Sequence, residues 1–228
     1  MSRVYLIPCP ISEDGLQTLS QQILPAVQLC EVFFVESERS ARRFLKKLWR
    51  EIHIDGLEWH EMGSESTRQA FENSIRRGKI IGIISDAGCP GIADPGQELI
   101  SIAQENKITV VPLVGPSSIL LALMASGMNG QKFTFHGYLP IEQSNRTKAI
   151  KDLEATVKKE GSTQIFIETP YRNNQMVESL LKNLHPHTKL CIATDVTGER
   201  ESIRTMSCGE WKRTIPDLHK KTVIYLIG

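Results

Sequence analysis

The stretch that decides the fold runs from Lys79 to Leu113 and reads KIIGIISDAGCPGIADPGQELISIAQENKITVVPL. Its first residues, Lys79 to Ile84, form a short Ile-rich run that is typical of a buried strand. Asp94-Pro95-Gly96-Gln97 then predicts a helix with Asp94 as its N-cap. A second strand is expected from Ile108 to Leu113, so the stretch predicts strand, loop, helix and strand of a parallel sheet.

The same alternation extends toward the N-terminus of the chain. Further strands are expected at Val4 to Ile7 and Glu31 to Val35, and helices at Ser37 to Arg50 and Ser64 to Arg77. After Gly115-Pro116, the segment Ser117 to Ser126 is apolar on nearly all sides, which predicts a helix buried between layers or between domains.

The second half of the chain restarts the alternation with a different order. Strands are expected at Lys132 to His136, Gln164 to Glu168, Lys189 to Thr194, Glu201 to Met206 and Thr222 to Ile227, and helices at Ser144 to Lys159 and Tyr171 to Leu184. Two strands that follow each other without a helix, near residues 190 and 205, indicate a mixed sheet. We therefore expect an α/β protein with a mostly parallel sheet in residues 1–115 and a mixed sheet in residues 116–228.

Composition excludes several classes of protein. The 228 residues are 40% hydrophobic with a formal net charge of +1, which is too apolar for disorder. No apolar run reaches the roughly 18 residues of a membrane span and no secretory signal is visible, so a cytoplasmic location is expected. The five cysteines are far apart with no C-x-x-C pair, so neither a disulfide framework nor a metal site is predicted.

Loops that follow the strands are the first candidates for a binding site, because ligands of open α/β sheets lie beyond the carboxyl ends of the strands. The loop from Ser85 to Gly96 holds three Gly and two Pro, which stiffens it and lets its backbone approach a ligand. Asp86 lies at the end of the strand and is either a ligand contact or part of a structural turn. No G-x-G-x-x-G follows the first strand and no P-loop or G-x-S-x-G occurs, which disfavours dinucleotide, P-loop and serine-hydrolase functions.

Four motifs occur in order along the chain. They are Ser85-Asp86-Ala87-Gly88-Cys89-Pro90 with Asp94-Pro95-Gly96, then Gly115-Pro116-Ser117-Ser118, then FTFHGYLP at Phe133 to Pro140, then Glu168-Thr169-Pro170-Tyr171-Arg172. Together they resemble the signatures of the tetrapyrrole methylase superfamily. The resemblance is strongest to the branch that methylates a ribose 2'-hydroxyl of a cytidine in small-subunit ribosomal RNA.

This resemblance implies a two-domain methyltransferase, usually a homodimer, that binds S-adenosylmethionine in the cleft between its domains. The residues that it implies for donor binding are Ile7, Pro8, Asp86, Ala87, Gly88, Cys89, Ile92, Ser117, Ser118, Ile119, Ile167 and Glu168. No catalytic residue is assigned. A hydroxyl acceptor must lose its proton, and the acids on suitable loops that could help are Glu36, Asp86, Glu168 and Glu199.

A run of cations lies in the helix expected after Glu36. Arg39, Arg42, Arg43, Lys46 and Arg50 are spaced to share one face of that helix. Such a stripe could follow an RNA backbone, with Arg39, Arg42 and Arg43 as substrate contacts, although a solvated surface is the commoner explanation of a charge run.

The substrate is open between two classes. Ribosomal RNA is favoured by the FTFHGYLP and Glu168 to Arg172 motifs and by the basic stripe. A tetrapyrrole or other small molecule is favoured by the near-neutral charge, by the absence of Lys and Arg from Thr194 to Gly198, and by an end directly after the last strand. A noncatalytic binding module with the same fold is a further alternative.

Overall fold

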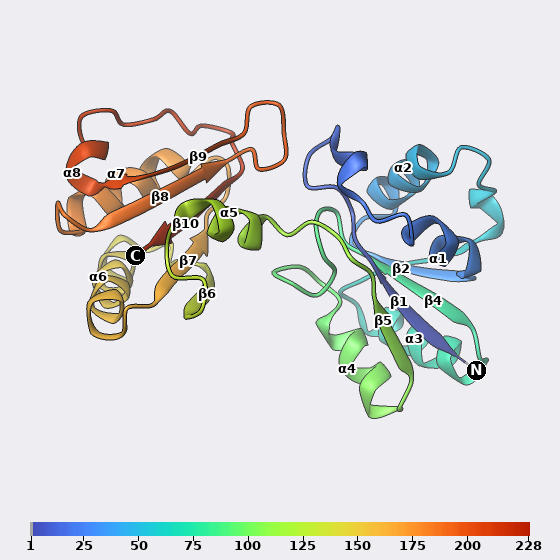
Figure 1. The fold of residues 1–228 in the computed structure, drawn as a ribbon. Helices are drawn as coiled ribbons and strands as arrows, with labels where there is room; N and C mark the ends of the chain where they lie inside the picture. Colours follow the sequence, from blue (N-terminus) through green and yellow to red (C-terminus); the bar gives the residue numbers. More distant parts are fainter. Residues whose placement is uncertain (1) are drawn as a thin grey trace. The chain divides into compact units, whose positions relative to one another are not determined.

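The computed structural model describes residues 2–228, and the chain forms two compact units (Figure 1). The first unit ends at Ser117 and the second begins at Ser118. Each unit has its own five-stranded sheet and its own hydrophobic core. No helix in residues 2–228 has the length and apolar character that crossing a membrane requires.

The sheet of the first unit is parallel throughout, in the strand order β3-β2-β4-β1-β5. Its strands are β1 (Arg3–Ile7), β2 (Val32–Val35), β3 (Glu58–Glu61), β4 (Ile80–Ile84) and β5 (Thr109–Pro112). The predicted parallel sheet is confirmed, but the sequence did not predict β3. This edge strand reads EWHE and is only half-buried, so it lacks the apolar run by which a strand is found.

Helices cover both faces of this sheet. They are α1 (Ile23–Leu29), α2 (Glu38–Leu48), α3 (Glu65–Arg76) and α4 (Gln97–Glu105), with short 3-10 turns at Gly15–Thr18 and Ile54–Gly56. Residues of α1 and α2 pack with Phe33 on one face, and residues of α3 and α4 pack with Phe34 on the other. The neighbouring strands β1 and β4 therefore lead into helices on opposite faces, and such a switch point is where open α/β sheets bind ligands.

Two of the three helix N-caps expected from the sequence are found in the structure. The Ser37 hydroxyl accepts a hydrogen bond from the Ser40 N–H, and the Ser64 hydroxyl accepts one from the Thr67 N–H. The N-cap of α4 is Gly96, which adopts a left-handed φ of 117°, so the prediction that Asp94 caps this helix is wrong. The left-handed turn at Gly96 delays the helix and leaves the Asp94 carboxylate in the loop.

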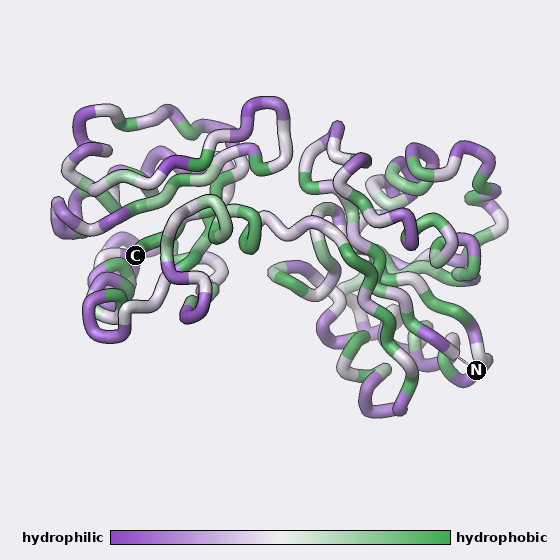
Figure 2. The backbone as a smooth tube through the Cα atoms, viewed as in Figure 1, coloured by the Kyte–Doolittle hydropathy of each residue, from purple (hydrophilic) through white to green (hydrophobic). Residues whose placement is uncertain are grey.

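The second unit has a mixed sheet, as predicted, and its strand order is β6-β7-β10-β8-β9. Its strands are β6 (Phe133–Tyr138), β7 (Thr163–Ile167), β8 (Lys189–Thr194), β9 (Ser202–Ser207) and β10 (Val223–Ile227). Only β6 and β7 are parallel neighbours, and the other pairs are antiparallel. The central strands of both sheets are largely hydrophobic in Figure 2, because each sheet is covered by helices.

Four helices belong to the second unit. They are α5 (Ser118–Ser126), α6 (Gln143–Glu160), α7 (Asn173–Asn183) and α8 (Cys208–Trp211). Residues of α6 and α7 pack on one face of the sheet, while α5 packs on the other through Ile119, Ala122 and Leu123. Leu120 and Met124 of α5 are 50% and 79% exposed, so only one side of this apolar helix is buried within the unit.

Candidate functional site

Three loops at the carboxyl edge of the first sheet are bonded to each other. The Cys9 N–H donates to the Gly88 carbonyl at 2.8 Å, and the Gly88 N–H donates to the Cys9 carbonyl at 3.1 Å. The Cys89 thiol lies 3.4 Å from the Pro116 carbonyl oxygen, to which it donates. These bonds connect the segments after β1, β4 and β5, and we call residues 7–9, 85–92 and 114–117 the loop cradle.

Two glycines make this close approach possible. Gly88 has a φ of 68°, a left-handed conformation that side chains disfavour. A Cβ atom at Gly115 would lie 2.1 Å from the Pro8 Cβ, which is far inside van der Waals contact. Gly115 therefore lets the loop after β5 rest directly against the loop after β1, and the cradle needs glycine at that position.

The structure brings one group of the predicted donor-binding residues together. Pro8, Ser117 and the run Asp86 to Cys89 all lie in the loop cradle, where Asp86 and Ala87 are exposed. Ile92 belongs to the same loop and is 55% exposed, whereas the Ile7 side chain is fully buried and offers only its backbone to a ligand.

The remaining predicted donor-binding residues belong to the second unit. Ser118 and Ile119 begin α5, and Ile167 and Glu168 lie at the end of β7. The cleft between the two units stays a prediction.

Three carboxylates gather at the edge of the first sheet. Oε2 of Glu36 accepts a hydrogen bond from the Asp86 N–H at 3.0 Å, which connects the ends of β2 and β4. Burial raises the pKa of Asp94 to about 6, with a further contribution from the charges of Glu36 and Asp86. Sequence reasoning missed Asp94 as a member of this group because its position before Pro95 also suits a helix cap.

Two thiols lie in the same cradle. Burial, followed by the nearby charges of Asp86 and Asp94, raises the pKa of the Cys9 thiol. Burial and Asp94 likewise raise the pKa of Cys89. Both sulfurs therefore stay protonated at neutral pH, and neither has the thiolate character of a cysteine nucleophile.

Glu168, the acid at the end of β7, is held by its own loop. Its side chain is 1% exposed. Oε1 accepts hydrogen bonds from Arg172 Nη2 at 2.7 Å, from Arg172 Nε at 3.0 Å and from the Thr169 N–H at 2.6 Å. This ion pair fixes the Glu168 to Arg172 motif as a compact turn, whereas Glu199, between β8 and β9, is exposed.

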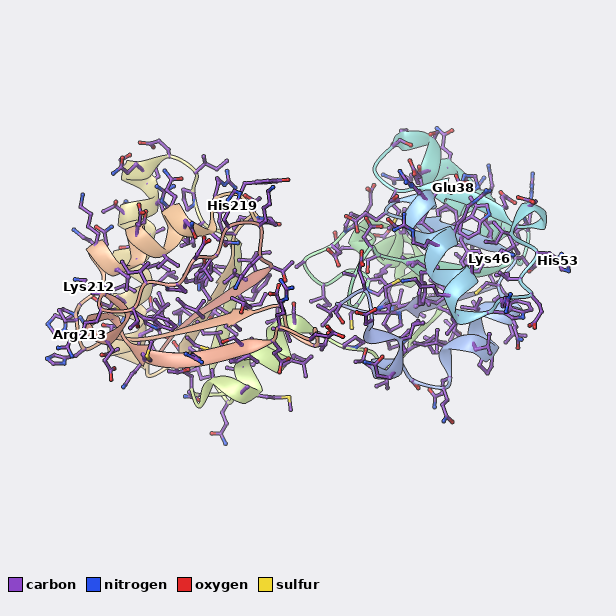
Figure 3. All side chains as sticks on the ribbon, turned by 90° about the horizontal axis from the view of Figure 1, so that it is seen from above. Glu38, Lys46, His53, Lys212, Arg213 and His219 are labelled. Carbon is purple, nitrogen blue, oxygen red and sulfur yellow. The ribbon has the colours of Figure 1, made fainter. Side chains whose placement is uncertain are left out.

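The predicted cation stripe on α2 is only partly available to a ligand. Arg42 forms an ion pair with Glu38 at 2.9 Å and lies 5.5 Å from the Trp59 ring. Lys46, labelled with Glu38 in Figure 3, donates to the Ile52 carbonyl at 2.7 Å. Arg50 follows the end of the helix at Leu48, so its placement on the helical face is wrong.

Two predicted cations of α2 remain open to solvent. Arg39 and Arg43 are exposed, and within residues 2–228 neither forms an ion pair or a side-chain hydrogen bond. The stripe is thus divided between cations that hold the unit together and cations that face solvent. In the described part of the chain no group of three or more His, Cys, Asp and Glu residues is arranged to hold a metal ion.

Comparison with known proteins identifies the family. A family model described as Tetrapyrrole (Corrin/Porphyrin) Methylases matches residues 3–211. The chain is 30% identical to the ribosomal RNA small subunit methyltransferase I of Vibrio cholerae, over 91% of this chain and 69% of that protein. It is 27% identical to the protein of the same name from Escherichia coli, over 99% of this chain and 77% of the relative. For the Bacillus subtilis protein of that name the identity is 31%, over 81% and 60% respectively.

A solved structure supports the same fold. The crystal structure of the methyltransferase CobJ matches 100% of this chain and 94% of its own with a TM-score of 0.65, at 16% sequence identity. The α/β architecture with one parallel and one mixed sheet is therefore that of a tetrapyrrole methylase. The chain belongs to the tetrapyrrole methylase family, whose members use S-adenosyl-L-methionine as the methyl donor.

Proposed function

We propose that this protein transfers a methyl group from S-adenosyl-L-methionine to a ribose 2'-hydroxyl of small-subunit ribosomal RNA. The observation that carries the proposal is the 30% identity, over 91% of the chain, to a protein named as a ribosomal RNA small subunit methyltransferase. The order of the four motifs along the sequence supports the same branch of the family.

The loop cradle suits the donor in shape and charge. Its backbone segments are held together without a side chain at Gly88 or Gly115, which lets a ligand approach the backbone closely. Ile92 and Val114, which are 55% and 73% exposed, offer apolar surface. The donor carries a positively charged sulfonium, and the carboxylates of Glu36, Asp86 and Asp94 complement a cation at this edge.

Asp86 is the carboxylate that we propose to accept the proton of the acceptor hydroxyl. Its side chain is exposed on the cradle, whereas Glu168 is held by Arg172 and Thr169. In the transfer, the hydroxyl oxygen bonds to the methyl carbon while the carbon–sulfur bond breaks and its electron pair goes to sulfur. The hydroxyl proton passes to Asp86, and most of the remaining work is alignment of the two reactants.

The second candidate is methylation of a tetrapyrrole or another small molecule. It is favoured by the family description and by the segment Thr194 to Gly198, which carries no cation for an RNA backbone.

One experiment separates the two candidates. The protein is incubated with donor carrying a labelled methyl group and, separately, with small ribosomal subunits, naked ribosomal RNA and a tetrapyrrole precursor. We expect label in a ribose of an RNA fraction. Label in the tetrapyrrole alone would overturn the RNA proposal, and failure of S-adenosylhomocysteine to bind in calorimetry would overturn the donor site.

A homodimer, the usual assembly implied by the family resemblance, is also proposed. Light scattering tests it, because one chain has a mass of 25.6 kDa and a dimer has twice that mass.

A further inference from the structure

A cavity of about 190 Å³ lies next to the loop cradle, within the first unit. It is an open hollow lined by the segment from Pro10 to Leu16, by α2 and by the first residues after β4. Asp86 and Ala87 line it, and both are also residues of the cradle. The cavity and the predicted donor loop therefore share one wall.

Two cations of α2 stand at this cavity. Arg43 and Lys47 are four residues apart, so they project from successive turns on the same side of the helix. Both are exposed, and Arg43 makes no ion pair or side-chain hydrogen bond within residues 2–228. The Lys47 ammonium has one long contact, at 3.4 Å, to the Glu13 carbonyl oxygen. A guanidinium and an ammonium placed in this way form a site for a phosphate group.

The rest of the cavity is suited to a base and a sugar. Ile11, Leu16 and Phe44 supply apolar wall, and Phe44 is only 8% exposed, which makes this wall rigid. The Ser40 hydroxyl and the Asp86 carboxylate supply polar groups that can meet sugar hydroxyls. A volume of about 190 Å³ is below the roughly 300 Å³ at which pockets for larger ligands begin, so it is too small for a macrocycle of four pyrrole rings and suits part of a nucleotide.

We propose that this cavity holds the acceptor nucleotide of the RNA substrate, with its phosphate on Arg43 and Lys47 and its ribose facing Asp86. The base lies against the wall formed by Ile11 and Phe44. This inference rests on the proposed function and names the part of the molecule that selects RNA. The RNA contact expected from five cations of α2 is thereby narrowed to two of its cations, which line a cavity beside the donor loop.

The test is a charge reversal with a matched control. Arg43→Glu with Lys47→Glu changes the net charge by four units, and so does Lys212→Glu with Arg213→Glu on the second unit, where both residues are exposed (Figure 3). Equilibrium binding of a short labelled single-stranded RNA is measured at several salt concentrations. Affinity for S-adenosylhomocysteine is measured for the same proteins by calorimetry.

The Arg43 and Lys47 variant is expected to bind this RNA at least about tenfold more weakly, with a salt slope reduced by about 0.7 for each lost contact. Its affinity for S-adenosylhomocysteine stays within about twofold of the unmodified protein, which shows that the cradle remains folded, and the Lys212 and Arg213 control keeps both affinities. The exchange variant Arg43→Lys with Lys47→Arg keeps both positive charges and should retain most of the RNA affinity of the unmodified protein.

Equal RNA binding by the charge-reversal variant and its control would overturn the cavity proposal while leaving the methyltransferase proposal intact. If the unmodified protein binds S-adenosylhomocysteine but neither this RNA nor small ribosomal subunits, the RNA substrate itself is wrong. If it does not bind S-adenosylhomocysteine, the proposed donor site is wrong. The acceptor proposal, which rests on the donor site, is then wrong as well.

Discussion

The loops after β4 and β7 both carry acidic residues just beyond a strand of a sheet. The acid after β7 is paired with a cation, whereas the acids after β4 are not, in the part of the chain that the structure describes. In the second unit, Glu168 is buried and accepts hydrogen bonds from Arg172 and from the Thr169 N–H. In the first unit, Asp86 and Asp94 lie near Glu36, and within residues 2–228 neither forms an ion pair with a cation.

This difference separates a structural acid from the acids that we propose to be functional. A buried carboxylate that accepts two hydrogen bonds from an arginine stabilises the turn that contains it, so its charge is already compensated. Carboxylates that repel each other at an open edge destabilise the free protein, and a positively charged ligand would relieve that repulsion. The first pattern fits a scaffold, and the second fits a site for the sulfonium donor.

The largest expected effect comes from removing the structural acid. Glu168→Ala leaves Arg172 without its partner and should lower the free energy of unfolding of the second unit by about 3 kcal/mol. Urea unfolding followed by circular dichroism measures the change. Glu199→Ala, at an exposed position, serves as the control and should change stability by less than about 0.5 kcal/mol. A Glu168 variant of unchanged stability that no longer binds S-adenosylhomocysteine would instead make Glu168 a donor ligand.

An intermediate effect is expected from filling the contact between two cradle loops. In Gly115→Ala the new methyl group collides with Pro8, so the loop after β5 must move, at a cost of about 2 kcal/mol in stability. The affinity for S-adenosylhomocysteine should fall at least about tenfold, since donor contacts depend on cradle geometry. Gly130→Ala is the matched control, because no atom lies within 4 Å of its added Cβ. Equal donor affinity in both variants would show that the cradle does not bind the donor.

The smallest effect concerns the raised pKa of Asp94, which is caused mainly by burial and further by the charges of Glu36 and Asp86. The pKa of Asp94 is about 6 in the folded protein, against an ordinary value of 3.8. The folded state therefore holds this proton more tightly than the unfolded state, so this contribution favours folding below about pH 4 and is lost as the pH rises through 6. Asp94→Asn should be more stable than the unmodified protein at pH 8 by about 1 kcal/mol, after allowance for solvent screening.

Thermal unfolding at a series of pH values measures this advantage, which should vanish near pH 4. Asp152→Asn, at an exposed position of α6, is the control and should show no such pH dependence. An Asp94→Asn advantage that is constant from pH 4 to pH 8 would contradict the raised pKa of Asp94.

Local patterns in the sequence were sufficient for most of the architecture. The apolar runs of β1, β4 and β5 and the serine caps of α2 and α3 act over a few residues, so they can be read without knowing the rest of the chain. The edge strand β3 escaped because its partly charged sequence becomes a strand only by pairing with β2 and by the stacking of Trp59 on Phe33. The residues of β3 therefore form a strand because of their contacts with β2, and a local pattern does not show those contacts.

In the candidate site too, some features can be predicted from the local sequence and others depend on tertiary contacts. The sequence by itself determined which loops carry glycine, proline and acid after which strands, and the ordered motifs pointed to the family, because these features lie along the chain. Only the tertiary structure decided that Gly115 rests on Pro8, that Asp94 joins Glu36 and Asp86 instead of capping α4, and that Arg42 turns toward Glu38 while Arg43 faces a cavity. Each of these outcomes depends on through-space distances between segments far apart in sequence or on competition between partners on neighbouring elements, which local propensity does not encode.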